Sequence, residues 1–236
     1  MQEFLKFIGH GFCHQIPSRS FEAGGLLFPV CARDTGIYLG FLFSVLLIFI
    51  LYSKHEKKPG DLPSLGYILL MALLVLPMAF DGLTSYFGLR ATTNTIRYIT
   101  GLCTGIALGS LIAPLLFAIR KDADLKQRIF AKPSLFVIQL ALSLALGTAF
   151  LFGYPYLGVI SPFFPVVAFL AILISITLVL LTLSKRFFPR HTYSHWLILL
   201  TICLILAFIE MAVFGALREL LVQSVLSGHD ISDFLQ

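Results

Sequence analysis

Residues 35–53 read TGIYLGFLFSVLLIFILYS and contain no charged side chain. A helix of about 17 to 25 apolar residues crosses the roughly 30 Å hydrocarbon core of a bilayer. Further apolar runs of similar length follow at approximately 63–80, 96–119, 134–152, 160–183 and 195–215. The pattern predicts an all-α polytopic membrane protein, built as a bundle of six transmembrane helices.

Composition also favours a membrane protein, because 58% of the 236 residues are hydrophobic and only 12% are charged. So few polar side chains cannot cover a soluble globule of this length. The net charge of +5 comes from short clusters of Lys and Arg between the apolar runs, where such residues orient helices in a bilayer. We therefore expect membrane lipids as partners and no nucleic acid, while the oligomeric state stays open.

Basic residues gather in the loops at 54–62, 120–133 and 184–194, and loops rich in Lys and Arg face the cytoplasm. These loops contain Lys54, Lys57, Lys58, Arg120, Lys121, Lys126, Arg128, Lys132, Lys185, Arg186 and Arg190. Both termini and the loops at 81–95 and 153–159 are then expected to be extracytoplasmic.

Three regions follow from this topology. Residues 1–34 are expected to form an extracytoplasmic N-terminal cap, in which a short amphipathic helix lies on the membrane surface. Prolines and glycines at positions 17, 24, 25 and 29 exclude a long helix, so 15–33 is expected to be an irregular loop. Residues 35–226 are the six-helix domain, and 227–236 are a C-terminal tail.

The third apolar run carries Gly101, Gly105 and Gly109 at four-residue spacing. This spacing leaves one face of a helix without side chains, so that another helix can approach closely. Glycine stripes are common and most have only a packing role. We predict that this face packs against a neighbouring helix.

Reactive side chains concentrate in GFCHQIPSRSF at 11–21 and PVCARDTG at 29–36, with a second polar cluster from Asp81 to Arg97. These motifs resemble the prokaryotic membrane family catalogued as domain of unknown function 2085, over approximately residues 8–110. The resemblance implies a prokaryotic cytoplasmic membrane. Members of that family usually have cysteine where this chain has Asp34, which would give a C-x-x-C motif. Its absence here argues against a four-thiol site or a C-x-x-C redox site and leaves a mixed Cys/His/Asp site open. The family name supplies no activity, so function must be argued from the site.

Spacing in the cysteine motifs suits a metal. His10, just before the first motif, stands with Cys13 and His14 at i, i+3 and i+4. Cys31 and Asp34 stand at i and i+3, so a helix would place each set on one face. Zinc takes Cys, His and Asp ligands, and a catalytic zinc keeps one position open for water. The predicted metal ligands are His10, Cys13, His14 and Cys31. Asp34 and Asp81 are the predicted catalytic carboxylates, and zinc, if any, is the cofactor.

Structural alternatives stay open for these residues. Cys13 and Cys31 on the outer side of a membrane can form a disulfide, which would stabilise the fold by about 3 kcal/mol through a loop of this size. Asp34 can serve as a cap of the following helix, and His10 can be a surface residue.

Basic and amide side chains on the same side predict an anionic ligand. Guanidinium groups beside hydroxyl donors suit a phosphate or carboxylate, so we expect an anionic lipid headgroup or lipid-linked substrate. The predicted substrate-binding residues are Arg19, Arg33, Arg90, Asn94 and Arg97. The alternative is that these arginines pair with Asp34, Asp81 and Glu22 and only stabilise the fold.

Other titratable groups fit this scheme less well. Glu210 lies inside the sixth apolar run, where a salt bridge to an arginine is the expected use. His191 and His195 have metal-ligand spacing but lie on the cytoplasmic side, so we interpret them as interfacial residues.

The sequence lacks a glycine-rich phosphate loop, a Ser/His/Asp order and an H-E-x-x-H motif. Any enzyme here would therefore be metal-assisted or use its own acid and base residues, and whether the chain is an enzyme stays open. The first expectation is a metal-dependent hydrolase or transferase acting on a lipid or lipid-linked anionic substrate at the extracytoplasmic face. The alternatives are a non-enzymatic membrane scaffold or assembly factor with a disulfide-locked cap, and a small-solute transporter.

Overall fold

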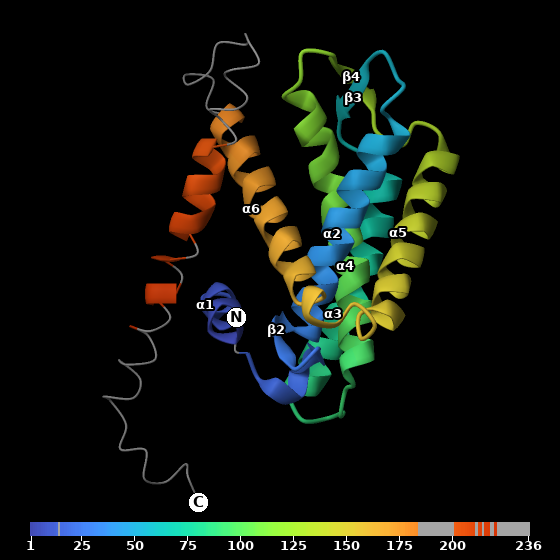
Figure 1. Ribbon diagram of the computed structural model, residues 1–236. Coiled ribbons are helices and arrows are strands. Elements are labelled where there is room, and N and C mark those ends of the chain that lie inside the picture. The colour runs from blue at the N-terminus through green and yellow to red at the C-terminus, as the bar shows by residue number, and fades with distance from the viewer. Residues whose placement is uncertain (14, 184–200, 211, 214, 218–219, 221–236) are drawn as a thin grey trace, which may run out of the picture.

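The computed structural model describes residues 1–13, 15–183, 201–210, 212–213, 215–217 and 220 (Figure 1). Its helices long and apolar enough to cross a membrane are α2 (Ala32–Leu51), α3 (Leu65–Tyr86), α4 (Asn94–Ala118), α5 (Pro133–Gly153) and α6 (Phe163–Leu183). They correspond to the first five predicted spans. The sixth predicted span, 195–215, begins outside the described residues, and its described part belongs to a shorter apolar helix, Thr201–Leu217. The described part of the chain is therefore mainly helical, with five helices of membrane-spanning length.

Helix α4 lies at the centre of the bundle and contacts α2, α3, α5 and α6 (Figure 1). Helices α2 and α4 approach so closely that no side chain fits at the glycines between them. A Cβ added at Gly105 would lie 2.0 Å from the carbonyl oxygen of Ile37, and one added at Gly36 would lie 2.2 Å from that of Tyr98. The prediction that the glycine face of this helix packs against a neighbour is confirmed, and the neighbour is α2.

Four buried polar side chains meet between α2, α4 and α5. Gln139 Nε2 donates to the hydroxyls of Ser44 at 2.8 Å and Ser143 at 3.2 Å, and the hydroxyls of Ser44 and Ser110 are 3.1 Å apart. An unsatisfied polar group in hydrocarbon costs several kcal/mol. The network therefore favours one alignment of these three helices.

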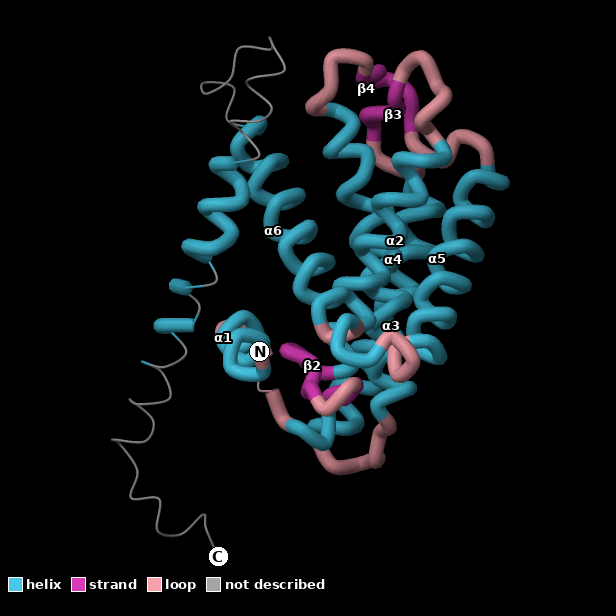
Figure 2. Tube along the Cα trace, viewed as in Figure 1, coloured by secondary structure: helices cyan, strands magenta, loops and turns pink. Residues whose placement is uncertain are grey.

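The residues before α2 form α1 (Gln2–His10), a 3-10 turn η1 (Pro17–Arg19) and a hairpin of β1 (Ser20–Ala23) and β2 (Leu26–Cys31) (Figure 2). The prediction of an irregular loop over 15–33 is wrong for most of this segment. Gly24 and Gly25 have φ values of 59° and 73°. Two consecutive positive φ values suit a two-residue turn between antiparallel strands, so the glycines build a hairpin as well as breaking a helix.

Helix α1 lies against β2 and α6. Leu5 and Ile8 are buried in a cluster with side chains of α6, while Phe7 on the opposite face is exposed. Gln2 acts as a strand neighbour, because its Oε1 accepts from the N–H of Leu27 at 2.9 Å and its Nε2 donates to the Leu27 carbonyl at 3.4 Å. One edge of the hairpin is thereby partly covered.

Two of the basic loops lie at the end of the bundle opposite α1 and the hairpin (Figure 2). They contribute β3 (Lys58–Asp61) and β4 (Ala123–Arg128), which pair in parallel. The buried Lys58 ammonium donates to the carbonyls of Tyr52, Ser53 and His55, just beyond the end of α2. A cation at this position complements the helix dipole.

The strand pair formed by these loops was not predicted. Its strands are short and polar, and they belong to loops that are distant in sequence, so neither shows the alternation of apolar residues that identifies a strand.

Candidate functional site

Cys13 follows α1 and is brought to the end of β2 by contacts of its neighbours. Gly9 lies so close to the carbonyl oxygen of Pro29 that an added Cβ would lie 1.8 Å from it. Gln15 has a φ of 53°, and its Nε2 donates to the same carbonyl at 3.0 Å. The chain therefore folds back between α1 and β2, which places Cys13 beside Cys31.

Cys13, Cys31 and Asp34 form a compact group, in which one sulfur or oxygen atom from each lies within 4.8 Å of the others. Cys31 Sγ donates to Asp34 Oδ2 at 3.2 Å. Cys13 Sγ accepts from the backbone N–H of Cys31 at 3.1 Å and of Gln15 at 3.5 Å. No disulfide joins the two cysteines. Two sulfurs and a carboxylate are a donor set for a borderline divalent cation such as zinc.

Asp34 is not the cap of α2, because the N-cap is Cys31 and Asp34 lies in the first turn of the helix. The helix starts three residues earlier than the predicted span at 35. This start corrects the capping alternative for Asp34. It places the carboxylate one turn after Cys31, near the helix N-terminus, where a negative charge is stabilised.

The two thiols differ in acidity. Interaction with the Cys31 thiol, helped by backbone N–H donors, lowers the pKa of Cys13 although burial opposes the shift. The same contact with Cys13, together with burial and the Asp34 carboxylate, raises the pKa of Cys31. Cys13 is therefore the more acidic thiol of the pair and Cys31 the less acidic one.

The predicted histidine ligands have different positions. His10 is the last residue of α1 and is not part of the compact group within the described residues. His14 lies outside the described residues, as do His191 and His195. Glu210 is described and half-buried, and its salt bridge stays a prediction.

Asp81 belongs to a second cluster, at the same end of the bundle. It is 1% exposed, and its Oδ2 pairs with Arg33 and its Oδ1 with Arg90, each at 2.5 Å. The Thr92 hydroxyl donates to Oδ1 at 2.7 Å. Because Arg33 belongs to α2 while Arg90 and Thr92 belong to the α3–α4 loop, the carboxylate ties three segments together. Pairing within the fold, the alternative for the arginines, therefore holds for these two.

Asn94 and Arg97 fasten the N-terminal segment to α4. Asn94 Nδ2 donates to two backbone carbonyls around the start of β1, at 3.3 and 3.2 Å, and its Oδ1 accepts from Arg97 at 3.0 Å. Arg97 lies within electrostatic range of Arg19 and Arg33. The predicted substrate-binding residues thus lie at one end of the molecule, and all but the exposed Arg19 have an assigned contact within the fold.

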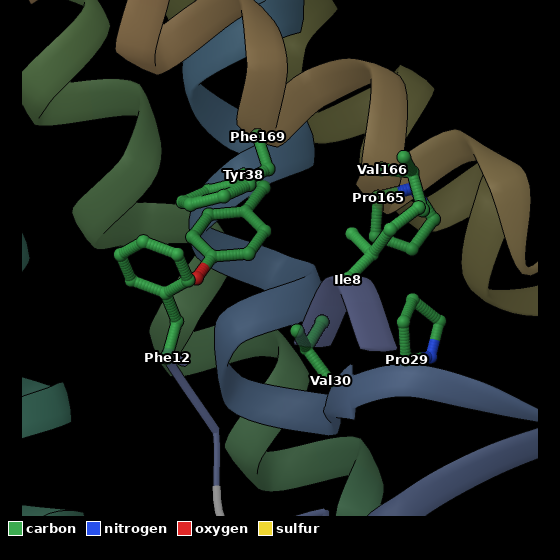
Figure 3. Close-up of a pocket in the computed structure, with 8 residues that line it drawn as sticks. All are labelled: Ile8, Phe12, Pro29, Val30, Tyr38, Pro165, Val166 and Phe169. Atoms are coloured by element: carbon green, nitrogen blue, oxygen red, sulfur yellow. The ribbon is translucent and has the colours of Figure 1, made fainter. Parts of the chain in front are cut away.

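A small apolar pocket adjoins the cysteine group, between α1, β2, α2 and α6 (Figure 3). Three of its lining residues are near neighbours of that group in the chain. Phe12 precedes Cys13, Val30 precedes Cys31, and Tyr38 lies one helical turn beyond Asp34. Hydrocarbon surface and metal-ligating atoms are therefore adjacent in this part of the fold.

Two positioning residues were not found from the sequence, Gln15 and Thr92. Gln15 holds the chain between the cysteines, and Thr92 bonds to the Asp81 carboxylate. The place of Gln15 inside the first cysteine motif was the only available signal for it. Thr92 stands in a run of hydroxyl residues, and nothing in the sequence distinguishes it from its neighbours.

Comparison with known proteins identifies the family. A model of predicted membrane proteins, DUF2085, matches residues 13–111. An uncharacterised protein of Methanothermobacter thermautotrophicus is 40% identical over 99 residues, which are 42% of this chain and 82% of that relative. The chain belongs to the DUF2085 family. An uncharacterised protein of Methanocaldococcus jannaschii is 36% identical over 105 residues, 44% of this chain and 64% of the relative. No solved structure matches this DUF2085 chain.

The match to the DUF2085 model begins at Cys13 and ends within α4. It contains both cysteines, Asp34 and the Asp81 cluster, whereas α5 and α6 lie outside it. Both relatives are uncharacterised proteins, so their names state no activity. The family comparison thus supports a membrane protein and leaves the chemistry to the site.

Proposed function

We propose that this DUF2085 chain binds zinc through Cys13, Cys31 and Asp34 and acts as a hydrolase or transferase on an anionic lipid or lipid-linked substrate. The observation that supports the proposal is the convergence of two sulfurs and a carboxylate within 4.8 Å. Zinc–sulfur bonds of about 2.3 Å give a tetrahedron with edges of about 3.8 Å. The group therefore needs only a small contraction to hold the ion.

The chemistry of the donors fits the metal. Cys13 supplies a thiolate whose charge is already stabilised by two backbone N–H groups, and Asp34 supplies an anionic oxygen. The fourth position would be taken by water or by His10 or His14, the histidines next to Cys13 in the sequence. When bound, zinc activates a water molecule and polarises a carbonyl or phosphoryl oxygen.

The Asp81 cluster supplies the binding side of this proposal. Asp81 holds the guanidiniums of Arg33 and Arg90 in place and acts as a positioning residue. With Arg97 and Arg19 nearby, guanidiniums outnumber this carboxylate, which favours an anionic group such as a lipid phosphate. Because two of the basic loops lie at the opposite end of the bundle, this end is assigned to the extracytoplasmic face.

Metal analysis of protein purified in detergent without chelators tests the centre. We expect about one zinc per chain for a single closed set of ligands. Cys13→Ser and Cys31→Ser should each lose the metal. Cys103→Ser, which changes a half-buried cysteine of α4 outside the group, is the matched control and should retain it. Equal zinc in all four proteins would contradict the proposal.

Incubation of the zinc-loaded protein with a total lipid extract tests the reaction. New lipid products should appear with the wild-type chain and be absent with Cys13→Ser. Arg97→Gln should reduce the rate, because it removes a charge near the anionic group. Unchanged lipids at every pH and zinc concentration would argue against hydrolysis and transfer.

A second candidate is a non-enzymatic membrane scaffold whose N-terminal segment is closed by a disulfide. The proximity of Cys13 and Cys31 favours it, since a disulfide there would lock the end of α1 to the start of α2. This candidate predicts that protein purified without reductant contains no zinc and that both cysteines resist alkylation. Reduction should then lower its thermal stability.

A further inference from the structure

Cys13 and Cys31 are close in space although the β1–β2 hairpin separates them in the chain. Their sulfurs lie no more than 4.8 Å apart, and no disulfide joins them. Gln15 and Gly9 fix the approach of the two segments through Pro29, and the Cys31 N–H bonds directly to Cys13 Sγ at 3.1 Å. The geometry thus presents a dithiol that is held together by the surrounding backbone.

We propose that this pair performs thiol–disulfide exchange with a low-molecular-weight disulfide. In the first step the Cys13 thiolate attacks one sulfur of the external disulfide, forming a mixed disulfide and releasing one thiolate. In the second step the Cys31 sulfur attacks Cys13 Sγ, forming the Cys13–Cys31 disulfide and releasing the second thiolate. The two cysteines are oxidised, and the external disulfide is reduced to two thiols.

The order of the two steps follows from the contacts of each sulfur. Cys13 Sγ accepts two backbone N–H bonds, which stabilise the thiolate needed for the first attack. Cys31 Sγ instead donates to Asp34 Oδ2 at 3.2 Å. That carboxylate is placed to accept the Cys31 proton as the second attack begins, so Cys31 is the resolving thiol.

Burial restricts the reaction partner. Cys13 is only 7% exposed, and its neighbour Phe12 lies in the apolar pocket. A sulfur in such a position is shielded from the surface of a folded protein, so the partner that the proposal requires is a small disulfide. The extracytoplasmic side assigned to this end of the bundle is also the compartment where disulfides persist.

This activity goes beyond the proposed function, because it needs no metal and uses the sulfurs as electron donors. The two states exclude one another, since a sulfur in a disulfide is no longer a thiolate ligand for zinc. Zinc bound at the group would block exchange, and oxidation would release zinc. The two proposals can therefore be tested separately on one protein.

The test uses the full chain in detergent, with Cys103 and Cys203 replaced by serine, reduced and freed of metal by a chelator. Oxidised glutathione is added, remaining thiols are alkylated, and the protein is digested with trypsin. Cleavage after Arg19 separates the two cysteines, so a disulfide appears as a linked pair of peptides by mass spectrometry. We expect that linked pair and the loss of both alkylatable thiols. Two unreacted thiols, or glutathione retained on both cysteines, would overturn the proposal.

Single substitutions separate the two steps of the exchange reaction. Cys31→Ser should stop the reaction at a glutathione adduct on Cys13, whereas Cys13→Ser should slow adduct formation at Cys31 by about tenfold or more. Asp34→Asn should slow closure of the mixed disulfide by about tenfold or more. It should not slow the first step, because the Asp34 charge raises the pKa of Cys13. Glutathione accumulating on Cys31 in preference to Cys13 in the wild-type chain would contradict the order of attack.

A zinc arm separates this inference from the proposed function. Protein preloaded with zinc should resist exchange if Cys13 and Cys31 hold the ion. Exchange at the same rate with and without zinc would argue against the metal centre and leave the dithiol activity standing. If the protein binds zinc but the metal-free form shows no exchange, the metal centre is supported and the dithiol activity is overturned.

Discussion

Asp81 stabilises the end of the bundle that contains the cysteine group. Its carboxylate is 1% exposed and pairs with two arginines. Asp81→Asn leaves both guanidiniums without their counter-ion, which should destabilise the protein by about 2–3 kcal/mol, less than for a fully buried pair because Arg90 is partly exposed. Thermal unfolding in detergent measures the effect.

The matched control for Asp81 is Asp122→Asn at the other end of the bundle. Asp122 pairs with Arg120 at 2.8 Å, and both side chains are partly exposed. Exposed pairs contribute at most about 1 kcal/mol. Equal losses of stability at the two positions would contradict the structural importance given to Asp81.

The cysteine pair predicts a specific pH dependence of alkylation. The pKa of Cys13 is lowered and that of Cys31 is raised relative to an ordinary thiol. As pH rises, iodoacetamide should therefore modify Cys13 with a midpoint below that of the same cysteine in denatured protein, and Cys31 with a midpoint above it. The midpoint reports acidity independently of accessibility. Identical midpoints for both cysteines would contradict the opposite shifts of their pKa values.

The direction of each pKa shift determines how the free energy of unfolding depends on pH. A lowered pKa in the folded state stabilises the protein above the unfolded pKa of Cys13, and that contribution is lost as pH falls through the folded pKa. A raised pKa does the reverse, so the contribution of Cys31 is lost as pH rises through its folded pKa. These two contributions are therefore both present when Cys13 is deprotonated and Cys31 is protonated.

At the scale of elements, the contact between α2 and α4 is the closest in the bundle. Gly105→Ala would place a methyl group 2.0 Å from a backbone carbonyl of α2, and the backbone cannot rotate away as a side chain can. We expect a loss of about 2 kcal/mol of stability, typical of overpacking. Gly66→Ala in α3 is the control, because its Cβ would meet nothing within 4 Å. Tolerance of both changes would mean that the helices are not packed this closely.

The helices and strands differ in how well they can be predicted from the sequence. Long apolar runs identify α2 to α6 because a membrane span needs only length and hydrophobicity. The β1–β2 hairpin escaped prediction because Gly24 and Gly25 signal both a break and a turn, and only pairing in space decides between them. The start of α2 at Ala32 was missed because Cys31, a weak capping residue, is its N-cap.

The candidate site was likewise predicted only in part from the sequence. The sequence predicted that Cys13 and Cys31 share a metal site or form a disulfide, and their proximity in the fold agrees with both expectations. It offered Asp81 only as one of three possible partners for the arginines, beside Asp34 and Glu22, because 48 positions separate Asp81 from Arg33 and the sequence does not choose among the carboxylates. Spacing predicts neighbours within one element, whereas partners from different elements depend on the tertiary arrangement.

At the scale of the whole molecule, the orientation in the membrane can be measured directly. In a chain whose native cysteines are replaced by serine, Gln2→Cys and Leu89→Cys should react with a membrane-impermeant maleimide on intact cells. Lys126→Cys, in the opposite basic loop, should react only after permeabilisation, because Lys and Arg are retained in the cytoplasm. The reverse pattern would place the cysteine group on the cytoplasmic side.

The metal centre is the central claim, and X-ray absorption at the zinc edge of the purified full-length protein tests it most directly. We predict two sulfur ligands at about 2.3 Å together with oxygen or nitrogen ligands at about 2.0–2.2 Å. Cys13→Ser and Cys31→Ser should each remove one sulfur from the zinc shell or abolish binding. A zinc shell of oxygen and nitrogen alone, or one unchanged by both substitutions, would contradict a centre built on Cys13, Cys31 and Asp34.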